Sequence, residues 1–62
     1  MSRLIPGDRV IDTRYGDPAT VRATAYDKPA GIDGHGIVVE YDDEPDVPVS
    51  TGTVHFRLTP AA

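Results

Sequence analysis

The amino-acid sequence alternates between apolar and polar residues with a period of two, most clearly in its middle. Gly36–Asp43 is rich in β-branched residues, which fit the pleated, half-buried surface of a β-sheet. As a strand, this segment places Ile37, Val39 and Tyr41 on one face, because successive side chains point to opposite faces. Pro45 follows several acidic residues and ends the strand, since proline has no N–H to donate. We expect the sheet to be built around this segment.

Four other segments predict shorter strands. Ala19–Tyr26 is the clearest, because its apolar residues are spaced by two. A helix is the alternative there, since alanine is a good helix former, but Thr20, Val21 and Thr24 are β-branched and favour a strand. The remaining strands are expected at Asp8–Asp12, at Val47–Val49 as a brief edge strand, and at Thr53–Leu58. Residues typical of turns and loops separate these segments, at Tyr15–Pro18, Asp27–His35, Asp43–Asp46 and Ser50–Gly52.

This organisation predicts one all-β domain over residues 1–62, a small five-stranded antiparallel barrel. Closure into a barrel would protect the edges of so small a sheet from aggregation. The side chains expected to point inward are Leu4, Val10, Val21, Ala23, Ile37, Val39, Tyr41, Val49, Val54, Phe56 and Leu58.

Composition limits the chemistry of such a domain. Cysteine is absent from the 62 residues, so neither a disulfide nor a thiolate metal site is present. His35 and His55 lack the close spacing of zinc ligands, and we expect no metal or cofactor. No apolar run approaches the roughly 20 residues of a membrane span, and the N-terminus lacks the apolar region of a signal peptide. These features predict a cytoplasmic protein.

Short motifs along the chain resemble those of a known superfamily. They are the opening Pro6-Gly7-Asp8-Arg9-Val10, the strand residues Thr20-Val21, the segment Gly36–Asp43 and the closing Phe56-Arg57-Leu58-Thr59-Pro60. Together they resemble the SH3-like barrel superfamily, especially its KOW and Tudor-type members. The resemblance implies a five-stranded barrel, and it says more about fold than about function, since such barrels bind RNA, DNA, peptides or other proteins.

The type II dihydrofolate reductases share this architecture and a similar Gly-Asp-Arg-Val opening. Where that family has Val-Gln-Ile-Tyr in its active pore, this chain has Val54-His55-Phe56. The glutamine and tyrosine of the motif are missing, and we therefore expect no enzymatic activity.

Two groups of residues predict a surface that binds a protein partner. Ile11, Tyr26 and Val38 lie on faces expected to point outward, and clustered exposed apolar residues are typical of interaction sites. Partial cover by loops is the alternative for these three. The second group contains five carboxylates within seven positions: Glu40, Asp42, Asp43, Glu44 and Asp46. Their spacing does not fit a calcium loop, and they form either an acidic rim for a partner or a solvated turn that keeps the sheet edge soluble.

Four arginines predict an alternative, nucleic-acid-binding role. Arg9, Arg14, Arg22 and Arg57 fall on outward faces or in a turn, with Tyr15 and Tyr26 nearby, and basic and aromatic side chains together can form a nucleic-acid groove. The net charge of −4 opposes this role. We therefore expect a non-enzymatic interaction module that binds a protein partner or a second copy of itself. The preference for arginine over lysine suggests a bacterial or phage accessory protein.

Overall fold

The protein is built from β-strands. The computed structural model describes residues 4–29 and 34–59, and for residues 26–29 it describes the backbone alone. In these residues no helix is long and apolar enough to cross a membrane. The elements in chain order are β1 (Arg9–Asp12), β2 (Pro18–Pro29), β3 (His35–Tyr41), β4 (Pro48–Gly52), the 3₁₀ turn η2 (Thr53–His55) and β5 (Phe56–Leu58). The all-β fold expected from the alternating pattern is confirmed.

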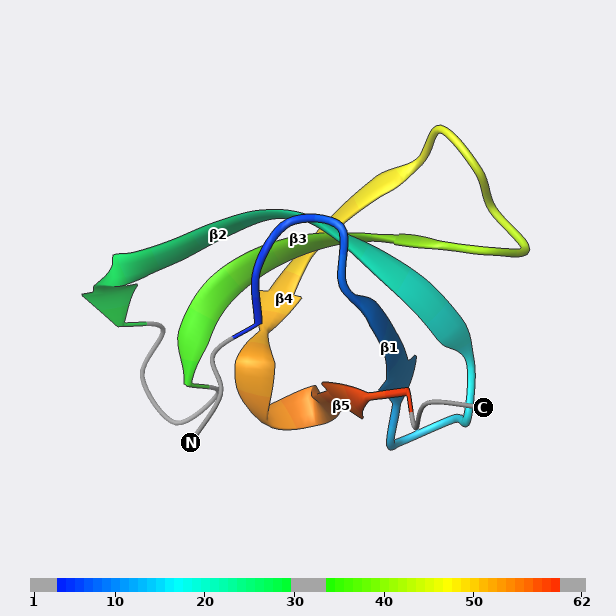
Figure 1. Ribbon diagram of the computed structural model, residues 1–62, viewed down its shortest axis with the longest axis horizontal. Helices are drawn as coiled ribbons and strands as arrows, with labels where there is room; N and C mark the ends of the chain where they lie inside the picture. Colours follow the sequence, from blue (N-terminus) through cyan, green and yellow to red (C-terminus); the bar gives the residue numbers. More distant parts are fainter. Residues whose placement is uncertain (1–3, 30–33, 60–62) are drawn as a thin grey trace.

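The five strands form one antiparallel sheet in the order β4-β3-β2-β1-β5. Figure 1 shows that the sheet is strongly curved, with β2 and β3 arching over β1 and β5. The last strand lies next to the first. In the described part of the chain, however, no pairing joins β4 to β5. The sheet is open at these two edges, and the predicted closure into a barrel is not confirmed.

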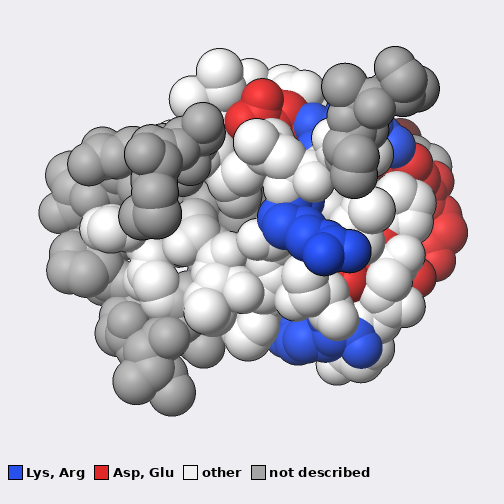
Figure 2. Space-filling model, turned by 60° about the horizontal axis from the view of Figure 1, so that its bottom comes forward, with Lys and Arg blue, Asp and Glu red and all other residues white. Residues whose placement is uncertain are grey.

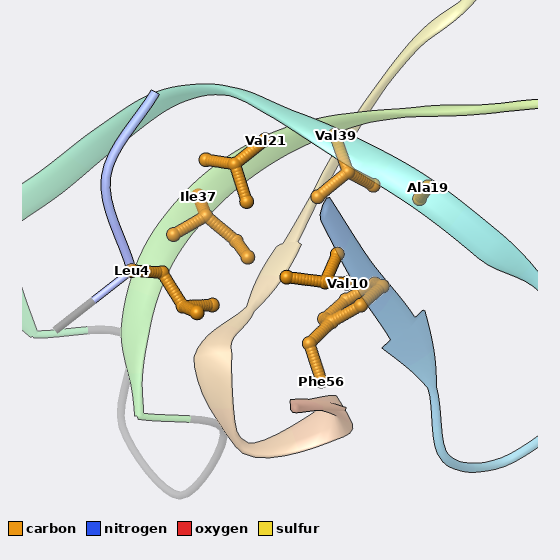
Figure 3. Close-up of a cluster of buried hydrophobic side chains, with 7 residues drawn as sticks. All are labelled: Leu4, Val10, Ala19, Val21, Ile37, Val39 and Phe56. Atoms are coloured by element: carbon orange, nitrogen blue, oxygen red, sulfur yellow. The ribbon is translucent and has the colours of Figure 1, made fainter. Parts of the chain in front are cut away.

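The hydrophobic core lies on the concave side of the sheet (Figure 3). Val39 of β3 faces Val21 in β2 and Val49 in β4, and because side chains alternate between faces, this row identifies the inward side. Tyr41 and Val49 pack against the core and are partly buried. The buried members are Leu4, Val10, Ala19, Val21, Ile37, Val39 and Phe56. The pattern correctly predicts six of these seven, and Ala19 is the one it does not single out.

An extra residue in β2 reverses the direction of its side chains partway along the strand. Val21 pairs with Val39, but the next paired residue of β2, Ala23, faces Val38. Because β2 advances by two residues while β3 advances by one, Arg22 forms a β-bulge. Beyond the bulge Ala23 shares the outward face with Val38 and is exposed. The prediction that Ala23 lies in the core is therefore wrong.

The chain that leads into β5 also differs from the sequence prediction. The turn expected at Ser50–Gly52 instead belongs to β4, which pairs with β3 over its whole length. The strand expected over Thr53–Leu58 is shortened by η2, and only its last three residues form β5. A 3₁₀ turn has a period of about three rather than two residues, and Val54 within it is 58% exposed. Leu58 at the end of β5 is 44% exposed, so the prediction that these two side chains lie in the core is wrong.

The connection between β2 and β3 is shorter than the sequence suggests. A loop is expected over Asp27–His35, but β2 continues to Pro29, which pairs with His35 at the start of β3. The side chain of Tyr26, one of the predicted contact residues, lies outside the described residues.

Gly34 lies directly before β3 and against η2. Its φ angle of 84° is in the left-handed region, which residues with a Cβ adopt only at a cost. A Cβ on Gly34 would also meet the hydroxyl of Thr53. The same hydroxyl accepts a hydrogen bond of 3.2 Å from the backbone N–H of His35. Glycine is therefore required here both for its backbone conformation and for its small size.

Replacing Gly34 by alanine should destabilise the fold more than replacing Gly16. Gly16 has a φ of 77°, but a Cβ there would meet nothing within 4 Å. Gly16→Ala therefore carries only the cost of a left-handed backbone, about 1–2 kcal/mol. Gly34→Ala adds the clash with Thr53, and urea unfolding of both variants measures the difference. An equal loss in the two would show that the contact with Thr53 is unimportant.

Candidate functional site

The outer, convex side of the sheet has a charged region and an uncharged region. Neighbouring residues on adjacent strands form rows across this face. The charged row consists of Arg9, Thr20, Glu40 and Pro48. The next row, beyond the bulge, has no charged member and consists of Ala23, Val38 and Ser50. A further uncharged row consists of Ala25, Gly36 and Gly52.

The uncharged rows surround a hollow of about 200 Å³. No side chain of these rows is larger than that of valine, so the surface is depressed between the strands. The hollow is lined by Ala23, Thr24, Ala25, Gly36, Ile37, Val38 and Ser50. A small, mainly apolar hollow with one or two hydroxyl groups at its border suits a single aliphatic side chain.

The arginines of the charged region are paired with carboxylates. Arg9 binds both carboxylate oxygens of Asp42, one of them at 2.7 Å from Nη1, and it also donates to Thr20 Oγ1. These hydrogen bonds from Arg9 lower the pKa of Asp42. Arg22, in the bulge, places its Nε 4.0 Å from Glu40 Oε2. Two of the arginines predicted to bind nucleic acid are thus held by two of the carboxylates predicted to face a partner.

A third arginine is held by a buried carboxylate, that of Asp12, whose exposed fraction is 0%. Arg14 donates from Nε to Asp12 Oδ1 at 3.1 Å and from Nη2 to Oδ2 at 2.9 Å. The backbone N–H of Arg14 donates to Oδ1, and the Tyr41 hydroxyl donates to Oδ2 at 2.7 Å. Asp12 therefore connects the turn after β1 to the end of β3, and sequence reasoning did not identify it. Its only signal is a polar residue two positions after Val10, on the inward face of β1.

The hydrogen bonds around Asp12 keep it ionised. Those from Arg14 lower the pKa of Asp12 to about 2, against the opposing effect of burial. Burial, and then the hydrogen bond to Asp12, raise the pKa of Tyr41 to about 12. At neutral pH Asp12 is thus a carboxylate and Tyr41 a neutral donor. Neither group exchanges a proton near neutral pH, and their arrangement suits a structural role.

The structure places two of the predicted apolar contact residues, Ile11 and Val38, apart from each other. Ile11 pairs with Pro18 of β2, whereas Val38 pairs with Ala23. These two positions of β2 are five residues apart, which corresponds to roughly 15 Å along a strand. Val38 lines the hollow, and Ile11 lies on the outer face beside Arg57.

The other predicted charged residues lie in two separate places. Asp43, Glu44 and Asp46 are exposed in the turn between β3 and β4, and this turn projects away from the other strands (Figure 1). Arg57 is exposed on β5 and makes no ion pair with the residues that the structure describes. Figure 2 shows the basic side chains of one face as separate groups divided by neutral surface, with acidic groups along one edge. On this face the arginines do not form a continuous basic strip.

Within residues 4–29 and 34–59, no group of three or more histidine, cysteine, aspartate or glutamate side chains could hold a metal ion. Comparison of the chain with protein-family models, with curated proteins and with solved structures gives no match. The possible functions are therefore argued from the surface itself.

Acid should remove the stability that Asp12 contributes. A folded-state pKa of about 2, against about 4 in an unfolded chain, corresponds to about 2.5 kcal/mol of stability at neutral pH. This stability is present above a pH of about 4 and is lost as the pH falls toward 2, because the unfolded chain binds the proton first. Urea unfolding across this range measures the loss. The Asp12→Asn variant should show a flatter profile, and an unchanged profile would contradict the role of Asp12.

Removing the Tyr41 hydroxyl should weaken the fold and raise the pKa of Asp12. Tyr41→Phe deletes a hydrogen bond to a charged acceptor, and such bonds contribute about 1.5–3 kcal/mol. Tyr15→Phe is the matched control, because Tyr15 is exposed and its ring, 5.2 Å below the Arg14 guanidinium, remains in place. Urea unfolding and an NMR titration of the Asp12 carboxyl carbon measure the two effects. Equal stability of the two variants would show that the hydroxyl is unimportant.

Proposed function

We propose that the protein is a non-enzymatic interaction domain that binds a protein partner through the uncharged part of its outer face. The observation that carries this proposal is the hollow beside Val38, which lies on the outer face of a sheet whose core is on the other side. An apolar depression on a surface that is otherwise charged is typical of a site for a partner side chain. Ala23, Val38 and Ser50, which neighbour one another across three strands, are among the residues that line it.

The distribution of charge supports a protein partner over nucleic acid. Arg9, Arg14 and Arg22 are already paired with carboxylates of the same chain, so among the described residues few cations are available to neutralise phosphates. The net charge is −4, and the acidic residues of the turn between β3 and β4 are exposed. A basic protein partner would be attracted to such a surface, whereas a phosphate backbone would be repelled.

We further propose that the domain is SH3-like, as the motifs near Gly7 and Tyr41 suggest. Two features support this assignment: one antiparallel sheet wraps around a single core, and its last strand lies beside its first. The open edge between β4 and β5 is a departure from a closed barrel. It matters for binding, because it leaves β4 with only one neighbouring strand in the described residues.

Binding should depend on Val38 and Ala23. Affinity capture from the source organism, with the wild-type protein as bait, should recover a protein that Val38→Asp and Ala23→Asp baits lose, because a charge in the hollow would be desolvated by the partner. Val54→Asp is the control, since Val54 is an exposed apolar residue on η2, outside the hollow. Circular dichroism checks that each variant is folded. Equal recovery by all baits would overturn the proposal.

Nucleic-acid binding should be weak and should not show a steep dependence on salt. Each phosphate neutralised by an arginine adds about one unit to the slope of log affinity against log salt. With three of the four predicted arginines paired internally, we expect a shallow slope. Fluorescence anisotropy of labelled single- and double-stranded oligonucleotides at low and moderate salt measures it. A steep slope that falls in the Arg57→Ala variant would favour the nucleic-acid hypothesis instead.

A further inference from the structure

The edge of the sheet next to the hollow has no neighbouring strand among the described residues. β4 pairs with β3 on one side over its whole length, and it is the terminal strand of the sheet. A terminal strand presents unpaired N–H and C=O groups, and an extended segment of another chain can pair with them. Pro48 limits such pairing only at the beginning of β4, because the residues after it retain their N–H groups.

The register of the sheet specifies which side chains of an added strand would reach the hollow. Ser50 is the last member of the row that starts at Ala23 and passes through Val38. A residue of an added strand that faces Ser50 would extend this row on the same face, because cross-strand neighbours lie about 5 Å apart. The Ser50 side chain is small, so a longer apolar side chain at that place could pass over it into the hollow.

The charges around β4 specify a second feature of the added strand. The residue that faces Pro48 lies two positions from the residue that faces Ser50, and it therefore shares the same face. Its row contains Glu40, and the exposed Asp46 and Glu44 lie in the turn that leads to Pro48. A basic side chain at this place would meet acidic groups, and an acidic one would be repelled.

We propose that β4 is the docking edge for an extended basic peptide segment, which adds a sixth strand to the five-stranded sheet. The segment carries an apolar side chain opposite Ser50 and a basic side chain two positions away, opposite Pro48. The residues on either side of the apolar one face the concave side beside Val49 and Thr51, and β-branched residues suit these positions. This inference rests on the proposed function and specifies the kind of partner that the surface binds.

A labelled peptide with the sequence Ser-Lys-Val-Leu-Val-Lys-Ser tests the proposal. It presents the same pattern in both directions, so it can pair with β4 in parallel or antiparallel orientation. Fluorescence anisotropy should show saturable binding, and replacing the leucine by aspartate, or both lysines by glutamate, should weaken it about tenfold or more. Among protein variants, Ala23→Asp and Val38→Asp should weaken binding similarly, while Val54→Asp should not. Binding of all three peptides with equal affinity would overturn the proposal.

Amide hydrogen exchange of the complex locates the contact. Strand addition should slow the exchange of amides within Pro48–Gly52 that face away from β3, and it should leave Phe56–Leu58 unchanged. Peptide binding without protection of β4 would overturn strand addition and leave the proposed function standing. If the peptide does not bind but partner capture still depends on Val38, strand addition is likewise overturned and the proposed function stands. Protection of β4 that grows with protein concentration in the absence of peptide would assign the edge to a second copy and overturn the proposal.

Discussion

The bulge at Arg22 is the constraint on which the arrangement of this small domain depends. β2 is the longest strand and pairs with β1 and β3, so its side chains contribute to both faces of the sheet. Before the bulge, Ala19 and Val21 point into the core; after it, Ala23 lies on the outer face. Without the extra residue, the outward positions beside Val38 would carry larger and more polar side chains. The hollow therefore exists because β2 changes phase between Val21 and Ala23.

A small core makes the buried carboxylate of Asp12 important. Among the described residues, seven apolar side chains form the buried core, and a chain of 62 residues buries only a modest share of its surface. Asp12 compensates in part, because its two oxygens accept hydrogen bonds from Arg14 and from Tyr41. The backbone carbonyl of Asp12 also accepts hydrogen bonds from the N–H groups of Tyr15 and Gly16. One fully satisfied carboxylate thus connects β1, the following turn and β3, where a purely apolar contact would connect only neighbouring side chains.

The alternation of apolar and polar residues was sufficient to predict the sheet, because a period of two is a property of each strand by itself. It placed Val10, Val21 and Val39 correctly in the core. The alternation failed at Ala23, since a bulge depends on how two strands pair and cannot be recognised in the sequence of one strand alone. The alternation failed at Val54, because the residues Thr53–Leu58 alternate as in a strand although Thr53–His55 form a 3₁₀ turn. The hollow shares the first difficulty, since its walls come from β2, β3 and β4 and depend on how these strands pair.

The ion pairs between arginines and carboxylates explain why the basic surface is weak. They also bear on the preference for basic peptides that we propose for the acidic surface. An arginine that donates to a carboxylate at hydrogen-bond distance, as Arg9 does to Asp42, would have to break that contact before binding a phosphate. The ion pairs of the described residues use the carboxylates of Asp12, Glu40 and Asp42. The exposed carboxylates of the turn between β3 and β4 take part in none of these ion pairs. Near β4 the unpaired charge of the described residues is thus negative, whereas the unpaired Arg57 lies on β5, at the other edge of the sheet. An incoming strand with a basic side chain opposite Pro48 would gain from this negative charge and would place the side chain two positions away over Ser50, because alternate residues of a strand share a face.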